Sequence, residues 1–187
     1  MQRPATSAAK DWNVVVTAYP EGRRPALRAL RRLGRAEPSG HYNVLLATVD
    51  DPLALLGTLE QQAQTEPVLI DSISRIAPAL ACFDYDADED FERQAAAAAS
   101  AWLPRLANKS FHVRIHPRGA GLTAHSQEVE ARLGAALLAA LAQAGASARI
   151  DFDDPDLILT IDAIHGRAGL GLWTREEMRG HRFLRPD

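Results

Sequence analysis

The sequence contains very little cysteine, because Cys82 alone occurs among its 187 residues. A disulfide framework and a cysteine-based zinc site are therefore excluded, and Cys82 fits a small buried position in a reducing compartment. No apolar stretch is long enough to cross a bilayer. The first ten residues also lack the apolar core of a signal peptide, so we expect a cytoplasmic protein without a membrane partner.

Lysine is nearly absent as well. Apart from Lys10 and Lys109, all the lysine and arginine positions of the chain are arginine. The formal net charge is −3, which disfavours nucleic-acid binding because such proteins usually carry a basic total. The charges are nevertheless sorted along the chain. Arginines concentrate at 23–35 and 167–185, and acids concentrate at 84–92 and 151–156. A chain sorted in this way can present one basic face despite its negative total.

Motifs for catalysis or metal binding are also missing. Residues 84–95 have the acidity of a calcium loop, but Glu89 stands where that loop needs glycine and Ala95 where it needs a bidentate carboxylate. The four aspartates of residues 151–156 are better explained as a turn into a strand than as a magnesium site or an acid–base pair. We therefore expect no metal, no cofactor and no enzymatic activity. A small enzyme acting through these aspartates is a hypothesis that would require them to converge on a metal in a pocket.

Three side chains alternate along an expected strand, namely His112, Arg114 and His116. Side chains two positions apart point to the same side of a strand, so the three should form one surface row. No third metal ligand is evident beside the two histidines. The row is either solvated or in contact with an anion, and the sequence leaves both interpretations open.

The first part of the chain predicts alternating strands and helices. Residues 1–10 are expected to be a disordered tail. The elements that follow are a strand, a helix ended by Gly34, a strand, a helix that begins at Asp51-Pro52, and a strand interrupted by Pro78. They span residues 12–19, 23–33, 41–49, 51–66 and 73–85. This order predicts a ferredoxin-like domain over residues 11–86.

The second part, residues 87–187, predicts another α/β domain, and the acidic composition near Asp86 marks the expected boundary. The helix at 126–145 has leucines at every fourth position on its inner face and Ser126 as its expected N-cap. The expected elements, in chain order, are a helix, a strand, a helix and two strands at 88–103, 110–116, 126–145, 148–152 and 154–164. The sequence therefore predicts a fold of mixed helices and strands, which is α/β in the broad sense that includes α+β folds.

The helix at 23–33 and the residues just after it carry six arginines with no acid between them. These could simply form a solvated helix surface, since arginine stems pack well on protein exteriors. Six guanidinium groups exceed what solubility needs, however, and guanidinium pairs with phosphate oxygens in a fork geometry. We therefore favour phosphate binding by Arg23, Arg24 and Arg28, with Lys109 and Arg114 as second candidates.

The second part resembles the THUMP domain, an RNA-binding module of tRNA-modifying proteins. The residues that carry the resemblance are Ser110-Phe-His-Val-Arg-Ile-His-Pro-Arg118, the helix with Leu133-Gly134, the turn Asp151-Phe-Asp-Asp-Pro-Asp156 and the strand Leu157-Ile-Leu-Thr-Ile-Asp162. THUMP domains often follow a ferredoxin-like domain, so the resemblance covers nearly the whole chain. The most similar arrangement is the two-part adaptor of tRNA cytidine N4-acetylation.

The resemblance implies a non-catalytic tRNA-binding protein that contacts the acceptor region and presents tRNA to a modification enzyme. It also implies that Arg118, at the end of the Phe-x-Val strand, contacts RNA. Because the sequence leaves no room for a catalytic domain after Asp187, we expect an adaptor. The alternative is a protein-interaction domain that keeps the fold and has lost RNA, which the acidic stretch 84–92 and the negative total favour.

Overall fold

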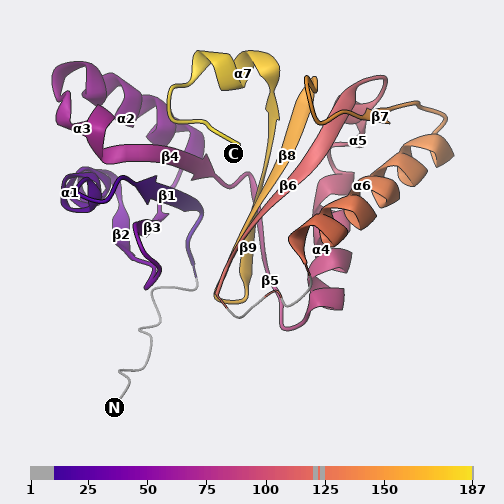
Figure 1. Cartoon of the computed structure of the whole chain (residues 1–187), viewed down its shortest axis with the longest axis horizontal. Coiled ribbons are helices and arrows are strands. Elements are labelled where there is room, and N and C mark those ends of the chain that lie inside the picture. Colours follow the sequence, from indigo (N-terminus) through magenta and orange to yellow (C-terminus); the bar gives the residue numbers. More distant parts are fainter. Residues whose placement is uncertain (1–10, 120–121, 123–124, 187) are drawn as a thin grey trace. The chain divides into compact units, whose positions relative to one another are not determined.

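The computed structural model describes residues 11–119, 122 and 125–186, and the chain forms two compact units (Figure 1). Unit 1 extends to Ala79 and also includes His181–Arg185, whereas unit 2 comprises Leu80–Gly180 and the residues after Arg185. The units divide before the boundary expected near Asp86, because the strand that precedes Asp86 pairs within unit 2. The expected tail, residues 1–10, lies outside the described residues.

Unit 1 is built from four strands and three helices. In chain order they are β1 (Val14–Ala18), α1 (Arg23–Leu33), β2 (Arg35–Pro38), β3 (Val44–Thr48), α2 (Pro52–Thr65), α3 (Val68–Ser72) and β4 (Ile73–Pro78). The sheet has the order β2-β3-β1-β4, and each pair of neighbours is antiparallel. This is the ferredoxin-like arrangement that the sequence predicts.

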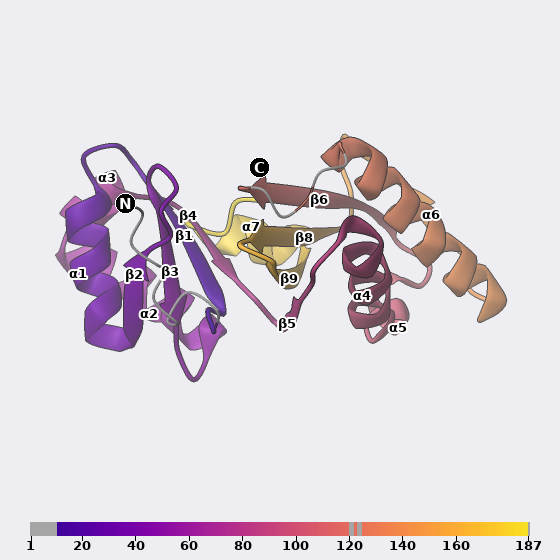
Figure 2. The same ribbon diagram turned by 90° about the horizontal axis from the view of Figure 1, so that it is seen from below.

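The core of unit 1 lies between this sheet and its helices (Figure 2). The run Val14-Val15-Val16 is completely buried, as expected for a β-branched central strand. Its neighbour β3 is also buried, with Val15 opposite Leu46 in the register. Leu30 of α1 and Leu59 of α2 complete the core from the helical side.

The ends of the helices in unit 1 follow the predicted chemistry. The Asp51 carboxylate accepts hydrogen bonds from the backbone N–H groups of Leu53 at 2.9 Å and Ala54 at 3.0 Å, which confirms it as the N-cap of α2. Gly34 follows α1 directly, as predicted. A Cβ atom there would lie 2.6 Å from both the Thr48 carbonyl oxygen and a methyl group of Val49, so the close approach of β3 excludes a side chain.

Strand β2 is an element that the sequence does not predict. Its four residues include one proline, and Ala36 is the single buried side chain among them. The strand lies at the sheet edge and forms its ladder with β3 alone. Such a short edge strand is specified by backbone pairing, so it has no hydrophobic periodicity that would reveal it.

Unit 2 combines a five-stranded sheet with four helices. Its elements are β5 (Ala81–Asp84), α4 (Asp88–Ser100), α5 (Leu103–Leu106), β6 (Ser110–Arg118), α6 (Ser126–Gln143), β7 (Arg149–Ile150), β8 (Leu157–Ile164), β9 (Arg167–Thr174) and α7 (Arg175–Gly180). The sheet order is β5-β9-β8-β6-β7. The pairs of β6 with β7 and β8 are parallel, and the other pairs are antiparallel.

Helices α4 and α6 cover one face of this sheet (Figure 2). Alternate residues of the strands, such as Phe111 on β6 and Leu159 on β8, form the core with Phe91 of α4 and Leu137 of α6. The fourfold leucine spacing of α6 therefore marks its inner face, as predicted. Its N-cap is His125 rather than the expected Ser126, which is the first helical residue, and the His125 side chain makes no capping hydrogen bond.

Two strands of unit 2 differ from the sequence-based expectation. The extended stretch 73–85 is interrupted after Pro78, as the proline predicts, and its second half becomes β5 beside β9. Strand β9 was not expected, because Gly169 and Gly171 weaken its strand pattern. The Trp173 ring lies against Gly171, where a Cβ atom would come within 2.5 Å of it, and its indole N–H donates to the Thr160 hydroxyl at 3.0 Å.

The segment His181–Arg185 returns to unit 1 and packs on β4. The backbone N–H of Ile76 donates to the Phe183 carbonyl at 2.8 Å, so the segment covers the open edge of β4. The Glu60 carboxylate of α2 holds the segment from the other side, since it lies 2.8 Å from Nδ1 of His181 and accepts from the Phe183 N–H at 3.2 Å. The Phe183 side chain is 1% exposed.

No helix in the described ranges combines the length and apolar character that a bilayer span requires.

The burial of Phe183 predicts that this segment contributes to the stability of unit 1. We expect Phe183→Ala to lower the free energy of unfolding by about 3 to 5 kcal/mol, because it removes a large core side chain and leaves a cavity. Urea unfolding followed by circular dichroism measures the change. Arg179→Ala, an exposed position on α7, is the matched control and should change stability by no more than about 0.5 kcal/mol. Equal, small effects of both substitutions would contradict the docked segment.

Candidate nucleic-acid interface

Helix α1 presents its arginines to solvent because a narrow apolar stripe anchors its other side. Ala26, Ala29 and Leu30 are buried against the sheet. All the arginines of the helix are exposed, namely Arg23, Arg24, Arg28, Arg31 and Arg32. No acid occurs in the first turn, so nothing there offsets the positive end of the helix dipole. The predicted arginine face is therefore accessible along the whole helix.

The arginines of this region fall into two groups. Arg31 donates from Nε to the Ala36 carbonyl at 3.1 Å. Arg32 pairs with Glu66 at 3.0 Å, and Arg35 lies 3.4 Å from Asp11. Acids of unit 1 thus partly neutralise Arg32 and Arg35, whereas a backbone carbonyl takes up one donor of Arg31.

The other group comprises Arg23, Arg24 and Arg28, the three residues that the sequence favours for phosphate binding. Within the described part of the chain they form no hydrogen bond and no ion pair, and all three are exposed. A guanidinium group without an internal acceptor keeps its full charge and all its donors for a ligand. This group is the strongest anion-binding candidate on unit 1.

A hollow of about 530 Å³ lies beside the N-terminus of α1. Its lining includes both Arg23 and Arg24, the apolar side chains of Pro20 and Leu27, and one acid, Glu21. The hollow therefore places two cationic groups beside a partly apolar wall, an arrangement that can accept a phosphate group with the sugar or base attached to it.

The second-ranked candidates lie on unit 2. Lys109 is exposed immediately before β6, and its carbonyl accepts from the Arg149 N–H at 3.2 Å. Arg114 is half-buried in the middle of β6. Arg118, the residue implied by the family resemblance, is half-buried at the end of β6 and stands opposite Ile164 of β8. These positions leave Lys109 more accessible than the two arginines.

The expected surface row on β6 is only partly correct. His112, Arg114 and His116 do share one side of the strand, opposite the core residues Phe111 and Val113. His112 is however buried to 4% exposure, so the prediction of a solvated surface position is wrong for it. Its Nδ1 lies 2.9 Å from the Asp151 carbonyl oxygen and its ring stacks on Phe152 with a centroid distance of 5.5 Å. These contacts hold the turn between β7 and β8 against strand β6.

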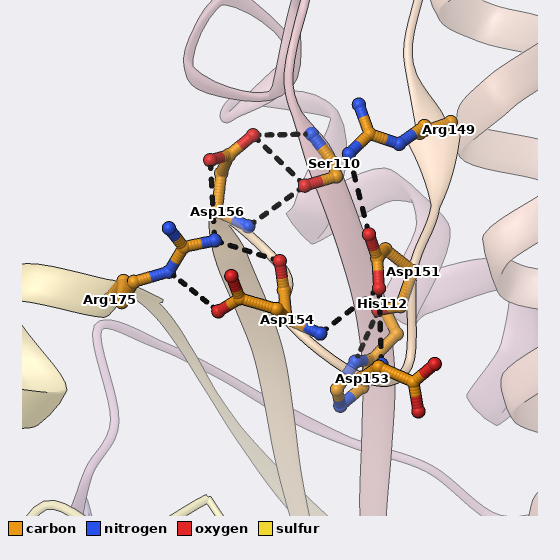
Figure 3. A network of polar contacts seen from close by, with 8 residues as sticks. All are labelled: Ser110, His112, Arg149, Asp151, Asp153, Asp154, Asp156 and Arg175. Carbon is orange, nitrogen blue, oxygen red and sulfur yellow. Dashed lines mark hydrogen bonds and ion pairs between the residues drawn. The ribbon is translucent and has the colours of Figure 1, made fainter.

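The aspartates of residues 151–156 form a structural turn between β7 and β8 (Figure 3). The Asp151 carboxylate accepts from the backbone N–H groups of Asp153 and Asp154, both at 3.1 Å. The Asp156 carboxylate accepts from the N–H and the hydroxyl of Ser110, both at 2.9 Å. Each interaction closes the turn or joins it to β6, which agrees with the structural explanation given to these residues.

Arg175 completes this network from the start of α7 (Figure 3). Its guanidinium group lies 3.0 Å from the Asp154 carboxylate and 3.7 Å from that of Asp156, and it donates to the Asp154 carbonyl at 2.7 Å. The aspartates thus meet a guanidinium group and backbone donors. Among the described residues, no group of histidine, cysteine and acidic side chains is arranged to hold a metal ion.

Hydrogen bonding lowers the pKa values of two of these carboxyl groups. The backbone N–H of Ser110 is the main cause for Asp156, and its hydroxyl adds to the effect. The pKa of Asp151 is lowered chiefly by the backbone N–H of Asp154, followed by that of Asp153 and by Arg149. Donors that favour the charged carboxylate stabilise the turn only while it is ionised.

Most arginines of unit 2 are matched by acids, which reduces its positive surface. Examples are the pairs of Arg167 with Asp84 at 2.9 Å and of Arg132 with Glu92. The acidic stretch 84–92 therefore supplies ion-pair partners as well as the first turn of α4, where Asp88–Asp90 suit the positive end of the dipole as predicted. Ion pairing with acids is therefore more extensive on unit 2 than around Arg23, Arg24 and Arg28 of α1.

Solved structures of larger proteins share this fold. PH1313 from Pyrococcus horikoshii matches 86% of this chain with a TM-score of 0.61 and 14% sequence identity. TrmN from Thermus thermophilus matches 85% with a TM-score of 0.57 and 22% identity. A 4-thiouridine synthetase in complex with RNA and ATP matches 86% with a TM-score of 0.52 and 16% identity. At such identities the likeness shows the fold, which is THUMP-like as the resemblance in the sequence predicts.

The chain spans about half or less of those structures, namely 54% of PH1313, 44% of TrmN and 41% of the 4-thiouridine synthetase. No protein-family model matches the sequence, and no curated protein matches it either.

The lowered pKa values predict how the turn responds to acid. A carboxyl group whose pKa is lower in the folded than in the unfolded state stabilises the fold above its unfolded value and loses this contribution as the pH falls. We expect the wild-type free energy of unfolding to decrease between about pH 5 and pH 2, and Asp156→Asn to weaken this dependence. Urea unfolding at a series of pH values measures it.

Asp153→Asn is the matched control, because the exposed Asp153 side chain has no contact of this kind and its backbone N–H remains. It should keep the wild-type pH dependence. If both variants behave alike, the Ser110–Asp156 contact does not carry the effect.

Proposed function

We propose that this chain binds tRNA through the arginine face of α1 and serves in tRNA modification. The observation that carries the proposal is the set of exposed, internally unpaired arginines Arg23, Arg24 and Arg28 on a THUMP-like fold. The likeness to a 4-thiouridine synthetase in complex with RNA supports RNA as the ligand. Guanidinium groups bind phosphate oxygens and release condensed counterions, so such a face supplies affinity for any RNA backbone.

Lys109, Arg114 and Arg118 would supply a second set of contacts, from unit 2. Their half-buried or strand-end positions limit how many phosphates they can reach, so we assign them a positioning role for the RNA. The acceptor region of tRNA is the part that we propose the chain to contact. Backbone contacts of this kind fix the orientation of RNA and carry little sequence information.

We further propose a non-catalytic role, in which the chain delivers tRNA to a modifying enzyme such as a cytidine N4-acetyltransferase. The acids that come closest to an active-site cluster support this view, because Asp151 is engaged by backbone donors of its own turn and Asp156 by Ser110 at the start of β6. In this proposal the chemistry comes from a separate enzyme or domain, and the chain supplies affinity for RNA.

A second candidate function is binding of a protein partner by the same fold. The observation that favours it is the exposure of large side chains, with Tyr42 at 80% and Phe152 at 69%, in a chain of net charge −3. Aromatic residues are enriched at protein interfaces. This candidate would gain support if the arginine face proved dispensable for function in a modification assay.

Replacing the unpaired arginines tests the proposed function. We expect the triple variant Arg23→Gln, Arg24→Gln and Arg28→Gln to weaken tRNA binding in gel-shift titrations. The salt dependence of binding should also fall by about one in the log–log slope for each arginine that contacts a phosphate. Arg118→Gln should have a smaller effect of the same kind.

The matched control is the triple variant Arg31→Gln, Arg32→Gln and Arg35→Gln, which removes the same charge from arginines that already have internal partners. It should retain most of the affinity. Equal weakening by both triple variants would show that total charge, and not this face, governs binding. Absence of tRNA binding by the wild-type chain at low salt would refute the proposed function.

A further inference from the structure

A second hollow of unit 1, of about 380 Å³, includes in its lining Tyr19, the residue at which the turn into α1 begins. Seven residues line it, namely Tyr19, Ile70, Asp71, Ile73, Arg182, Phe183 and Arg185. They come from the end of β1, from α3, from the start of β4 and from the docked segment His181–Arg185. The hollow therefore exists only because this late segment of the chain returns to unit 1.

Tyr19 stands at the rim of the hollow in a fixed backbone position. Its N–H donates to the Ser72 carbonyl at 2.9 Å, and its own carbonyl accepts from the Gly22 N–H at 2.9 Å, which closes the turn. The side chain is nevertheless 41% exposed. A large aromatic side chain held by its backbone and open to solvent is a suitable platform for stacking a base.

The two arginines of the hollow are exposed on a backbone that is held in place. Within the described residues the Arg182 side chain makes no hydrogen bond or ion pair, and Arg185 uses only Nε, which donates to the Arg182 carbonyl at 3.2 Å. The buried Arg75 donates from Nε to the Arg185 carbonyl at 2.7 Å and so fixes the end of the segment. Terminal guanidinium nitrogens of both arginines remain available for a phosphate.

This hollow and the one beside the N-terminus of α1 are lined by consecutive residues, since Tyr19 lines the first and Pro20 lines the second. Together their linings contain four arginines and two acids, Glu21 and Asp71. The net charge of the linings is therefore +2, from four positive and two negative groups. The exposed Tyr19 side chain therefore lines a hollow whose own charged residues, Arg182, Arg185 and Asp71, sum to +1.

We propose that the hollow around Tyr19 binds one unpaired nucleotide of an RNA strand. The base stacks on Tyr19 above the apolar floor of Ile73 and Phe183, and the adjoining phosphates contact Arg182 and Arg185. The site rests on the proposed function and extends it, because it assigns a separate role to the returning segment. Stacking combined with a positive groove is the usual way in which proteins hold single-stranded RNA.

Asp71 gives this site a preference among bases. Its exposed carboxylate is an acceptor only, and it lines the hollow beside the apolar floor. Cytosine and adenine carry exocyclic amino groups that can donate to a carboxylate, whereas uracil presents a carbonyl oxygen at the corresponding position. Oligocytidine should therefore bind more tightly than oligouridine of equal length and charge, and Asp71→Asn should reduce this difference.

Substitution of Tyr19 separates stacking from charge. We expect Tyr19→Ala to weaken the binding of a short oligocytidine by about 5- to 30-fold, and Tyr19→Phe to stay within about twofold of wild type, because the ring is retained. Fluorescence anisotropy with labelled oligocytidine measures both affinities in the full chain. Arg182→Gln should lower the salt slope by about one, while Arg179→Gln, an equally exposed arginine on α7, should leave it unchanged.

The outcomes distinguish this site from the proposed function. The proposed function stands if the wild-type chain binds tRNA and the α1 triple variant weakens that binding. The nucleotide site is overturned, even in that case, if Tyr19→Ala and Arg182→Gln bind oligocytidine like wild type. Equal losses for Tyr19→Ala and Tyr19→Phe would also overturn the stacking role. A wild-type chain that binds neither RNA refutes both. Circular dichroism of each variant confirms that it is folded.

Discussion

The contact between Ser110 and Asp156 sets the register on which unit 2 depends. Ser110 begins β6, and Asp156 directly precedes β8, so their paired hydrogen bonds align the starts of two parallel strands. A slip of one residue would turn the core face of β6 outward and expose Phe111. The acidic turn that could suggest catalysis is thus used to align the sheet, and it leaves the THUMP-like fold with a fixed central strand pair.

Pairing of arginine explains how a chain with a negative total charge can carry a cationic face. Acids distant in sequence neutralise some guanidinium groups, as Glu66 does for Arg32 and Asp84 does for Arg167. Arg24 and Arg28 have no such partner among the described residues. RNA binding therefore depends on the guanidinium groups that have no internal acceptor, and the net charge of the chain does not reveal them.

Local chemistry made much of the fold predictable from the sequence. The Asp51 cap, the valines of β1 and the leucine spacing of α6 each act within a few residues, and each is found as expected. Features that depend on distant partners were not predictable. The short edge strand β2 exists through its ladder with β3, and the position of Phe183 is set by Glu60 and Ile76, more than a hundred residues earlier. The same limit applies to the hollow around Tyr19, since Arg182, Phe183 and Arg185 of its lining come from a segment that no local pattern connects to Tyr19.

The return of residues 181–185 to unit 1 makes unit 2 an insertion between two pieces of unit 1. On the ribosome, the residues up to Ala79 emerge long before Phe183 is synthesised, so the edge of β4 stays uncovered in the interval. The continuous segment Leu80–Gly180 of unit 2 separates the two pieces of unit 1 in the sequence. Completion of unit 1 therefore requires that the chain has been synthesised beyond Gly180, so a nascent chain acquires the Tyr19 hollow only after residues 181–185 have been made.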